Sequence, residues 1–264
     1  MRRSLLPTIA LLTVAVPVAG HAASSPWFDT DGARLRIVTI AAPDADGTVR
    51  GVLQIMLEPG WKTYWKDPGD AGIPPQIDVS ASMNVASAEM SFPPPRRFDD
   101  GISHWAGYGA SVSLPVRFRV TDPARFTAID ADIFLGVCKE VCVPVQARLS
   151  VAPDDRFGDE AAVVAGFAGL PAQPDSDFGI SALRDTGSEL VAEANLPEGA
   201  DAPELFVVTP SGWRLKPPHA ERHGERVVFR IPVLERPKST AGTVEVEYTL
   251  VAGGKSVAGM VALP

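Results

Sequence analysis

The chain has 264 residues, among them 25 prolines, 23 glycines and 2 cysteines. Its formal net charge of −8 argues against nucleic acid and anionic membrane surfaces as partners, because both are polyanions. The length exceeds one typical domain and suits two small β domains, and the abundance of turn-forming residues favours an all-β chain.

The N-terminus has the pattern of a secretory signal peptide. Two arginines precede a short apolar stretch, residues 5–18, and a run of small residues follows. We therefore expect residues 1–22 to be a signal peptide that is cleaved near Ala22 and directs the protein to a bacterial periplasm. The stretch is too short to span a bilayer, and no later segment reaches 18 apolar residues, so no membrane insertion is expected. Loss of the two arginines would leave 22 basic and 32 acidic residues, a net charge of −10.

A first β-sandwich domain is predicted over residues 25–153. Several of its segments alternate between apolar and polar residues, which gives each strand one buried and one wet face, as in a sandwich of antiparallel sheets. The predicted strands before the cysteines are Ala33–Ala41, Val49–Leu57 and Val112–Val120.

The two cysteines, Cys138 and Cys142, lie at the turn of a predicted β-hairpin. Residues 129–137 and 143–151 both alternate strictly, which is typical of half-buried strands. Pairing these runs outward from the turn puts the apolar residues on one face and sets Cys138 opposite Cys142 on the other. A slip by one residue would reverse the faces, so the register is well determined.

The pairing also predicts how close the two cysteines lie. Pro144 cannot donate to the strand ladder, so its pair with Gly136 should be of the non-hydrogen-bonded type. Pair types alternate, so Cys138 and Cys142 should form such a pair too, with Cα atoms about 4.5 Å apart. A disulfide accepts Cα separations of about 4.4–6.8 Å, so the thiols can bond without backbone rearrangement.

Three roles are open for this pair from the residues alone. An exported protein permits a disulfide, which could undergo thiol–disulfide exchange. A passive clip is the second role, although closing a loop of about five residues contributes only ~2 kcal/mol. A metal pair is the third, with two sulfurs as the available ligands.

A helix and linker are predicted over residues 154–177, before a second β domain. The helix is expected over residues 154–170, because apolar residues recur at helical spacing and Pro171 stops it. Its expected apolar face consists of Ala161, Val164, Phe167 and Leu170. A second immunoglobulin-like β-sandwich is predicted over residues 178–264. Its strand candidates are Leu190–Asn195, Leu205–Thr209, Arg226–Ile231, Thr243–Val251 and Ser256–Ala262.

Five motifs in the first domain carry a resemblance to a known family. They are GWKTYWKDPGDAGIPP at residues 60–75, FPPPRRF at 92–98, GYG at 107–109, LPV at 114–116 and VCKEVCVP at 137–144. In this order they resemble the N-terminal periplasmic domain of the thiol:disulfide interchange protein DsbD. The three-residue gap between the cysteines is most similar to the ScsB-like branch, which is linked to copper tolerance.

The resemblance implies an immunoglobulin-like domain whose cysteines, here Cys138 and Cys142, shuttle between dithiol and disulfide without a cofactor. In the family this domain takes electrons from a membrane-embedded domain and reduces periplasmic thioredoxin-like proteins, as a protein-disulfide reductase does. Because the chain ends at Pro264 without such a donor, we expect a separate membrane-embedded thiol reductase as its partner.

The family also covers its cysteines with an aromatic cap loop. Phe98, Trp105 and Tyr108 are the candidates here, and an aromatic lid would restrict the disulfide to chosen partners. The alternative for Trp105 and Tyr108 is that they are ordinary core aromatics beneath a loop. Three further residues are possible neighbours of the sulfurs, namely Tyr64, Asp70 and Glu140.

Two other functions remain open in the sequence. One is a non-catalytic binding module with a structural disulfide. The other is a copper-handling protein in which His104 joins the thiols on a soft metal such as Cu(I). A second metal site at His219 and His223 is less favoured, because the prolines just before them predict a loop.

Overall fold

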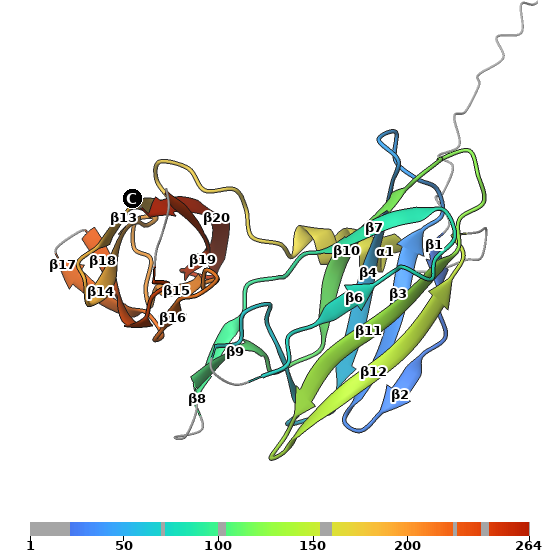
Figure 1. The fold of residues 1–264 in the computed structure, drawn as a ribbon, viewed down its shortest axis with the longest axis horizontal. Helices are drawn as coiled ribbons and strands as arrows, with labels where there is room; N and C mark the ends of the chain where they lie inside the picture. The colour runs from blue at the N-terminus through green and yellow to red at the C-terminus, as the bar shows by residue number, and fades with distance from the viewer. Residues whose placement is uncertain are drawn as a thin grey trace, which may run out of the picture.

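The computed structural model describes residues 22–69, 72–99, 104–153, 160–223, 226–238 and 243–263. Within these ranges the chain is all-β, with one short helix between two β-sandwich domains, as the sequence predicts (Figure 1). No helix in the described ranges combines the length and the apolar composition that crossing a bilayer requires.

The first domain consists of two six-stranded antiparallel sheets. One has the order β1-β3-β4-β10-β7 with β2 paired to β3, and the other has the order β12-β11-β5-β9-β8 with β6 paired to β11. The first sheet contains β1 (Ala22–Ser24), β2 (Phe28–Thr30), β3 (Ala33–Ile40), β4 (Thr48–Leu57), β7 (Val85–Met90) and β10 (Val112–Val120). The second contains β5 (Lys62–Tyr64), β6 (Gln76–Asp78), β8 (Arg96–Asp99), β9 (His104–Tyr108), β11 (Ile129–Cys138) and β12 (Cys142–Val151).

The long alternating runs form the strands that the sequence predicts. Their apolar residues fill one buried core between the two sheets, including Leu53, Phe118 and Leu135, none of which is accessible to solvent. The hairpin of β11 and β12 has the predicted register from Ile129 opposite Val151 to Cys138 opposite Cys142. Strand β1 extends the first sheet to Ala22, three residues before the predicted start of the domain.

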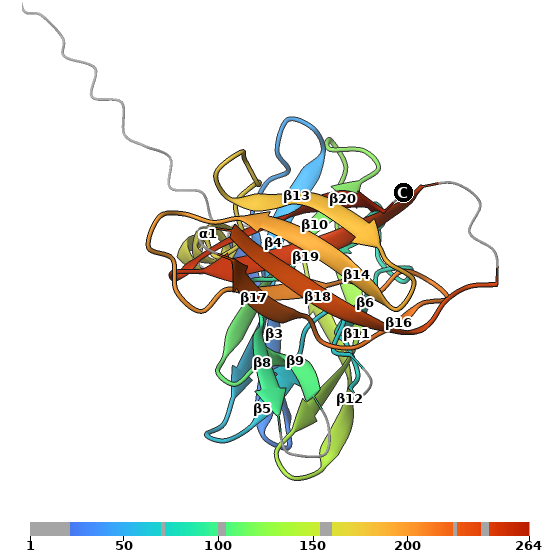
Figure 2. The ribbon, with the colours of Figure 1, turned by 90° about the vertical axis from the view of Figure 1, so that its left-hand side faces the viewer.

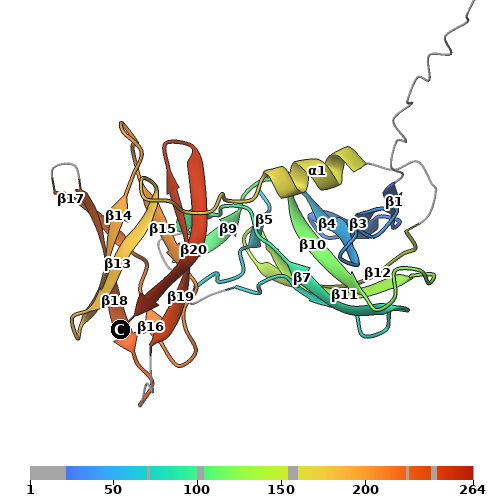
Figure 3. The same cartoon turned by 90° about the horizontal axis from the view of Figure 1, so that it is seen from above.

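Helix α1 (Glu160–Ala168) packs on the outer side of the first sheet, against β3, β4 and β10 (Figure 3). The predicted apolar face is only partly correct, since Phe167 packs against the core but Ala161 and Val164 are exposed. Val163 and Gly166 are buried, whereas Val164 is 53% exposed. The glycine explains the difference, because a Cβ at Gly166 would lie 2.5 Å from Val52 and the helix can approach the sheet closely only on this side.

The second domain is a smaller sandwich with its own core (Figure 2). A five-stranded sheet has the order β13-β14-β18-β16 with β17 paired to β18, and a three-stranded sheet has the order β15-β19-β20. The strands are β13 (Gly179–Asp185), β14 (Glu189–Asn195), β15 (Glu204–Val207), β16 (Arg214–Leu215), β17 (His219–His223), β18 (Arg226–Glu235), β19 (Val244–Ala252) and β20 (Lys255–Leu263).

The loop predicted around His219 and His223 is wrong, because these residues begin and end strand β17. The two prolines lie just before this strand, where their missing N–H groups leave its pairing with β18 intact. In an extended strand, two residues four apart have Cα atoms roughly 13 Å apart. That separation is too long for both residues to ligate one ion.

Candidate functional site

Cys138 and Cys142 form a disulfide at the tip of the β11–β12 hairpin. Their Cα atoms are 4.1 Å apart, slightly closer than predicted. Gly136, the next residue on the same side of β11, directs both of its backbone groups away from its partner Pro144. Its N–H donates to the carbonyl of Ile73, and its carbonyl accepts a hydrogen bond from Thr63 Oγ1. The predicted non-hydrogen-bonded pair type is therefore confirmed at Gly136 and Pro144.

The two cysteines differ in their access to solvent. Cys138 is 5% exposed, whereas Cys142 is exposed. The three turn residues between them are exposed as well, and Val141 is 72% exposed. A thiol from another protein can therefore approach Cys142 more readily than Cys138.

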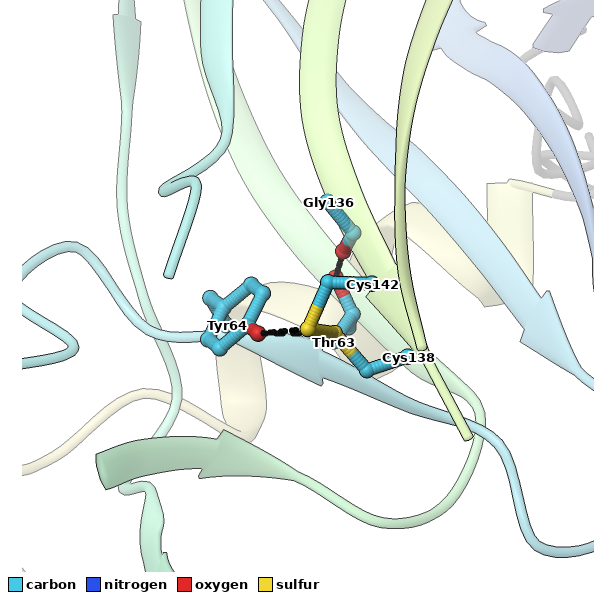
Figure 4. The surroundings of a disulfide bond; sticks show 5 residues. All are labelled: Thr63, Tyr64, Gly136, Cys138 and Cys142. Atoms are coloured by element: carbon cyan, nitrogen blue, oxygen red, sulfur yellow. Dashed lines mark hydrogen bonds between the residues drawn. A yellow bond between two sulfur atoms is a disulfide. The ribbon is translucent and has the colours of Figure 1, made fainter. Parts of the chain in front are cut away.

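The phenol of Tyr64 points at the disulfide (Figure 4). Its Oη lies 2.7 Å from Cys138 Sγ and 2.8 Å from Cys142 Sγ. A disulfide sulfur carries no hydrogen, so Tyr64 donates to it. If the bond were cleaved, the same O–H could donate to either thiolate, and hydrogen bonds to charged groups are the stronger ones.

Two glycines hold the Tyr64 ring in this position. A Cβ at Gly136 would lie 2.8 Å from Tyr64 Cε2, and a Cβ at Gly72 would lie 2.6 Å from Tyr64 Cδ1. Gly72 also has φ +137°, a conformation that side-chain-bearing residues rarely adopt. Both positions must lack a side chain for the phenol to reach the sulfurs.

Aromatic residues cover the buried sulfur from strands β8 and β9. Tyr64, Trp105 and Cys138 form one buried cluster, with Phe98 packed against it. The Trp105 ring meets Tyr64 edge-on at 5.2 Å between centroids and stacks on Phe98 at 4.3 Å. Lys62 Nζ lies 5.3 Å from the Phe98 centroid and 5.4 Å from that of Trp105, within cation–π range. We call this side of β5, β8 and β9 the sulfur face.

The opposite side of the same three strands, which we call the core face, points away from the disulfide. Trp65, Ala106 and Tyr108 belong to the main core of the first domain. Tyr108 donates a hydrogen bond of 2.8 Å to the carbonyl of Pro93, and burial raises the pKa of its phenol well above the usual value. The structure thus places Tyr108 among the core aromatics, whereas Phe98 and Trp105 lie over the cysteines.

The other predicted neighbours of the sulfurs have different positions. Glu140 is exposed on the turn, directed to solvent rather than into the aromatic cluster. Asp70 lies outside the described residues. The sequence did not predict Lys62 as part of the site, although its place two residues before Tyr64 puts both side chains on one face of a strand.

The described residues contain no group of three or more His, Cys, Asp and Glu side chains that could hold a metal ion. His104, the candidate third ligand for copper, is the first residue of β9, with its Nδ1 3.4 Å from a carboxylate oxygen of Asp99. The arrangement around the sulfurs is aromatic and hydroxylic, which suits the handling of a thiolate.

Comparison with known proteins agrees with this geometry. Residues 36–153 match the family "Thiol:disulfide interchange protein DsbD, N-terminal". This segment is a DsbD N-terminal domain. It includes Tyr64, the aromatic residues of the sulfur face and both cysteines, so the whole disulfide site lies within the DsbD-like part of the chain. Comparison with curated proteins gives no match.

A solved structure extends the similarity to the second domain. The chain resembles the crystal structure of the N-terminal periplasmic domain of ScsB from Proteus mirabilis, with a TM-score of 0.75 and 21% sequence identity. The match covers 91% of this chain and 98% of that one. At this identity the likeness establishes a shared fold, and the fold includes both β domains. The chain thus shares the two-domain architecture of that ScsB domain.

Proposed function

We propose that this protein is a periplasmic thiol–disulfide exchange protein, with Cys138 and Cys142 as its catalytic pair. It receives electrons from a membrane-embedded thiol reductase and passes them to thioredoxin-like partners. The observation that carries the proposal is the asymmetry of the disulfide. One cysteine is an exposed residue, the other is buried among aromatic rings, and one phenol contacts both sulfurs.

The reductive half of the cycle begins at the exposed sulfur. A thiolate of the reductase attacks Cys142 Sγ, a new S–S bond forms, and the Cys138–Cys142 bond breaks with Cys138 leaving as a thiolate. The Tyr64 O–H, already 2.7 Å from Cys138 Sγ, stabilises this leaving group. A second thiolate of the reductase then attacks the reductase sulfur that is bonded to Cys142 in the mixed disulfide. This step releases the reduced pair and leaves the reductase oxidised.

The oxidative half reverses these roles. The Cys142 thiolate attacks the disulfide of a thioredoxin-like partner and forms a mixed disulfide with it. Cys138 then attacks Cys142, which restores the intramolecular bond and releases the partner as a dithiol. Two electrons leave this protein for each disulfide that it reduces. The aromatic cover favours partners that can reach Cys142 at the tip, because it shields Cys138 from direct attack.

Trapping experiments in cells test the proposal. A Cys138→Ala variant keeps the exposed sulfur but cannot resolve a mixed disulfide, so it should accumulate covalent complexes with thioredoxin-like proteins. The matched Cys142→Ala variant keeps only the covered sulfur and should accumulate far fewer. If Cys138→Ala forms no covalent complex in the periplasm, the exchange function is contradicted.

We further propose the processing and the domain boundaries. A signal peptide over residues 1–22 would leave Ala23 and Ser24 to pair in β1, and the domains would cover about residues 25–153 and 178–264. N-terminal sequencing of the exported protein should give a start at Ala23 or Ser24. A start beyond Thr30 would remove β1 and β2 and would contradict the assigned signal.

A further inference from the structure

The second domain contacts the first at the core face of β5, β8 and β9. Phe206 of β15 is 2% exposed and belongs to the core of the first domain. Its ring meets Trp65 edge-on at 5.9 Å between centroids. Trp65 directly follows Tyr64, the residue that contacts both sulfurs, so the two side chains point to opposite sides of one short segment. In Figure 3, strands β5 and β9 lie at the edge of the first domain that faces the second domain.

Arg97 makes a second connection of the same kind. Its guanidinium lies 4.9 Å from the Phe206 centroid, donates a hydrogen bond of 2.9 Å to the carbonyl of Leu205, and lies 3.8 Å from a carboxylate oxygen of Glu204. Burial lowers the pKa of Arg97, and the Glu204 charge partly offsets this effect. A partly buried cation needs such partners, so removing it should loosen the contact between the domains.

The segment after β5 is held by both domains. Lys66 forms an ion pair with Glu247 of β19, and an Asp67 carboxylate oxygen accepts a hydrogen bond of 2.6 Å from the backbone N–H of Thr209. The carbonyl of the next residue, Pro68, accepts a hydrogen bond of 3.1 Å from the N–H of Ala106 in β9. A chain of contacts therefore connects the second domain, this segment and the strand that carries Trp105.

We infer that the second domain acts as a brace that holds the aromatic cover over Cys138. The positioning residues of this contact are Arg97 of β8 in the first domain and Phe206 of β15 in the second. Strands β5, β8 and β9 have only three to five residues each, and such short strands hold their position only when one face is packed. Their core face is packed in part by the second domain. The inference deepens the proposed function, on which it rests, by giving the second domain a role in controlling access to the disulfide.

A rate measurement with a small thiol tests the brace. Arg97→Met should raise the rate at which dithiothreitol reduces the Cys138–Cys142 disulfide of the full-length protein by about tenfold, because a lost hydrogen bond to a charged group eases local opening. Arg236→Met is the matched control. Arg236 lies over Trp213 at 5.2 Å, pairs with Asp185 and donates to the carbonyl of Gly187, all within the second domain. We expect its reduction rate to stay within about twofold of the wild-type rate.

Hydrogen exchange separates a brace from general destabilisation. In Arg97→Met and in Phe206→Leu, exchange should rise in residues 96–99 and 104–108 and stay unchanged in the distant β3–β4 pair. A rise throughout the first domain, or a reduction rate equal to that of Arg236→Met, would overturn the brace. The small thiol needs no cellular partner, so the brace can be confirmed even if trapping contradicts the exchange function.

Discussion

The two faces of β5, β8 and β9 contrast in composition and in role. The sulfur face carries Tyr64, Phe98 and Trp105 around a disulfide, whereas the core face carries Trp65 and Tyr108 in the main core of the first domain. Both faces are aromatic, so residue type alone does not distinguish them. The difference comes from the two-residue period of a strand, which sends neighbouring side chains to opposite sides. Substitutions of core residues that pack only within the first domain should therefore change stability, and those on the sulfur face should change exchange.

The largest effect on stability is expected from the core side of the hairpin. Leu135 in β11 is inaccessible to solvent, and Leu135→Ala should lower the free energy of unfolding by about 2–5 kcal/mol, through lost burial and a cavity. The reduction potential should be unchanged, because Leu135 lies on the face away from the sulfurs. Urea unfolding of the oxidised protein and equilibration with glutathione measure the two quantities. A shift in potential comparable to the loss of stability would remove the distinction between the faces.

On the sulfur face, Tyr64→Phe should lower the rate at which a dithiol reduces the disulfide, about tenfold. A hydrogen bond to a charged group contributes about 1.5–3 kcal/mol, and part of this stabilises the departing Cys138 thiolate. Stopped-flow reduction of the oxidised protein measures the rate. An unchanged or faster rate would show that the phenol acts only as a cover.

Gly136→Ala should disturb the same tyrosine without removing its hydroxyl. The new methyl would lie 2.8 Å from the ring, and such overpacking costs about 1–3 kcal/mol. We expect lower stability together with a changed reduction rate, because the ring must move. Gly169→Ala is the control, since its Cβ would meet only ordinary contacts at 3.4 Å and beyond. Equal behaviour of the two variants would contradict the placement of Tyr64.

Tyr108→Phe is the counterpart on the core face and should have the smallest effect. It loses one hydrogen bond to Pro93, worth about 1 kcal/mol, and should leave the reduction rate unchanged. Burial raises the pKa of Tyr108 above 10.0, so its stabilising contribution is complete below that pH and is lost as the pH rises through the raised pKa. Above pH 10.0, the urea concentration at the unfolding midpoint should therefore fall less steeply with rising pH in Tyr108→Phe than in the wild type. An equal slope in both proteins would show that ionisation of Tyr108 does not cause the loss of stability at high pH.

Much of the fold could be predicted from the sequence because its long strands alternate over nine or ten residues. The hairpin of β11 and β12 is the clearest case, since its register follows from the pattern and fixes which side the cysteines take. The short strands β5, β8 and β9 could not be identified, because three to five residues carry too little alternation to separate a strand from a loop.

The same limit explains how the lid residues divided. Trp105 and Tyr108 are three residues apart, so once they share a strand they must lie on opposite faces. A loop imposes no such restriction, and the sequence therefore predicted both as lid residues. The role of the second domain depends on Phe206 meeting Trp65, a contact between residues 141 positions apart that no local pattern reveals.

The reduction potential of the Cys138–Cys142 pair tests the central claim most directly. It can be measured on the full-length protein by equilibration in glutathione buffers, followed by alkylation of free thiols. An exchange-active pair should have a potential above about −300 mV and reach equilibrium with the buffer. A potential below about −300 mV, typical of structural disulfides, would contradict the account and leave the bond as a clip of the hairpin.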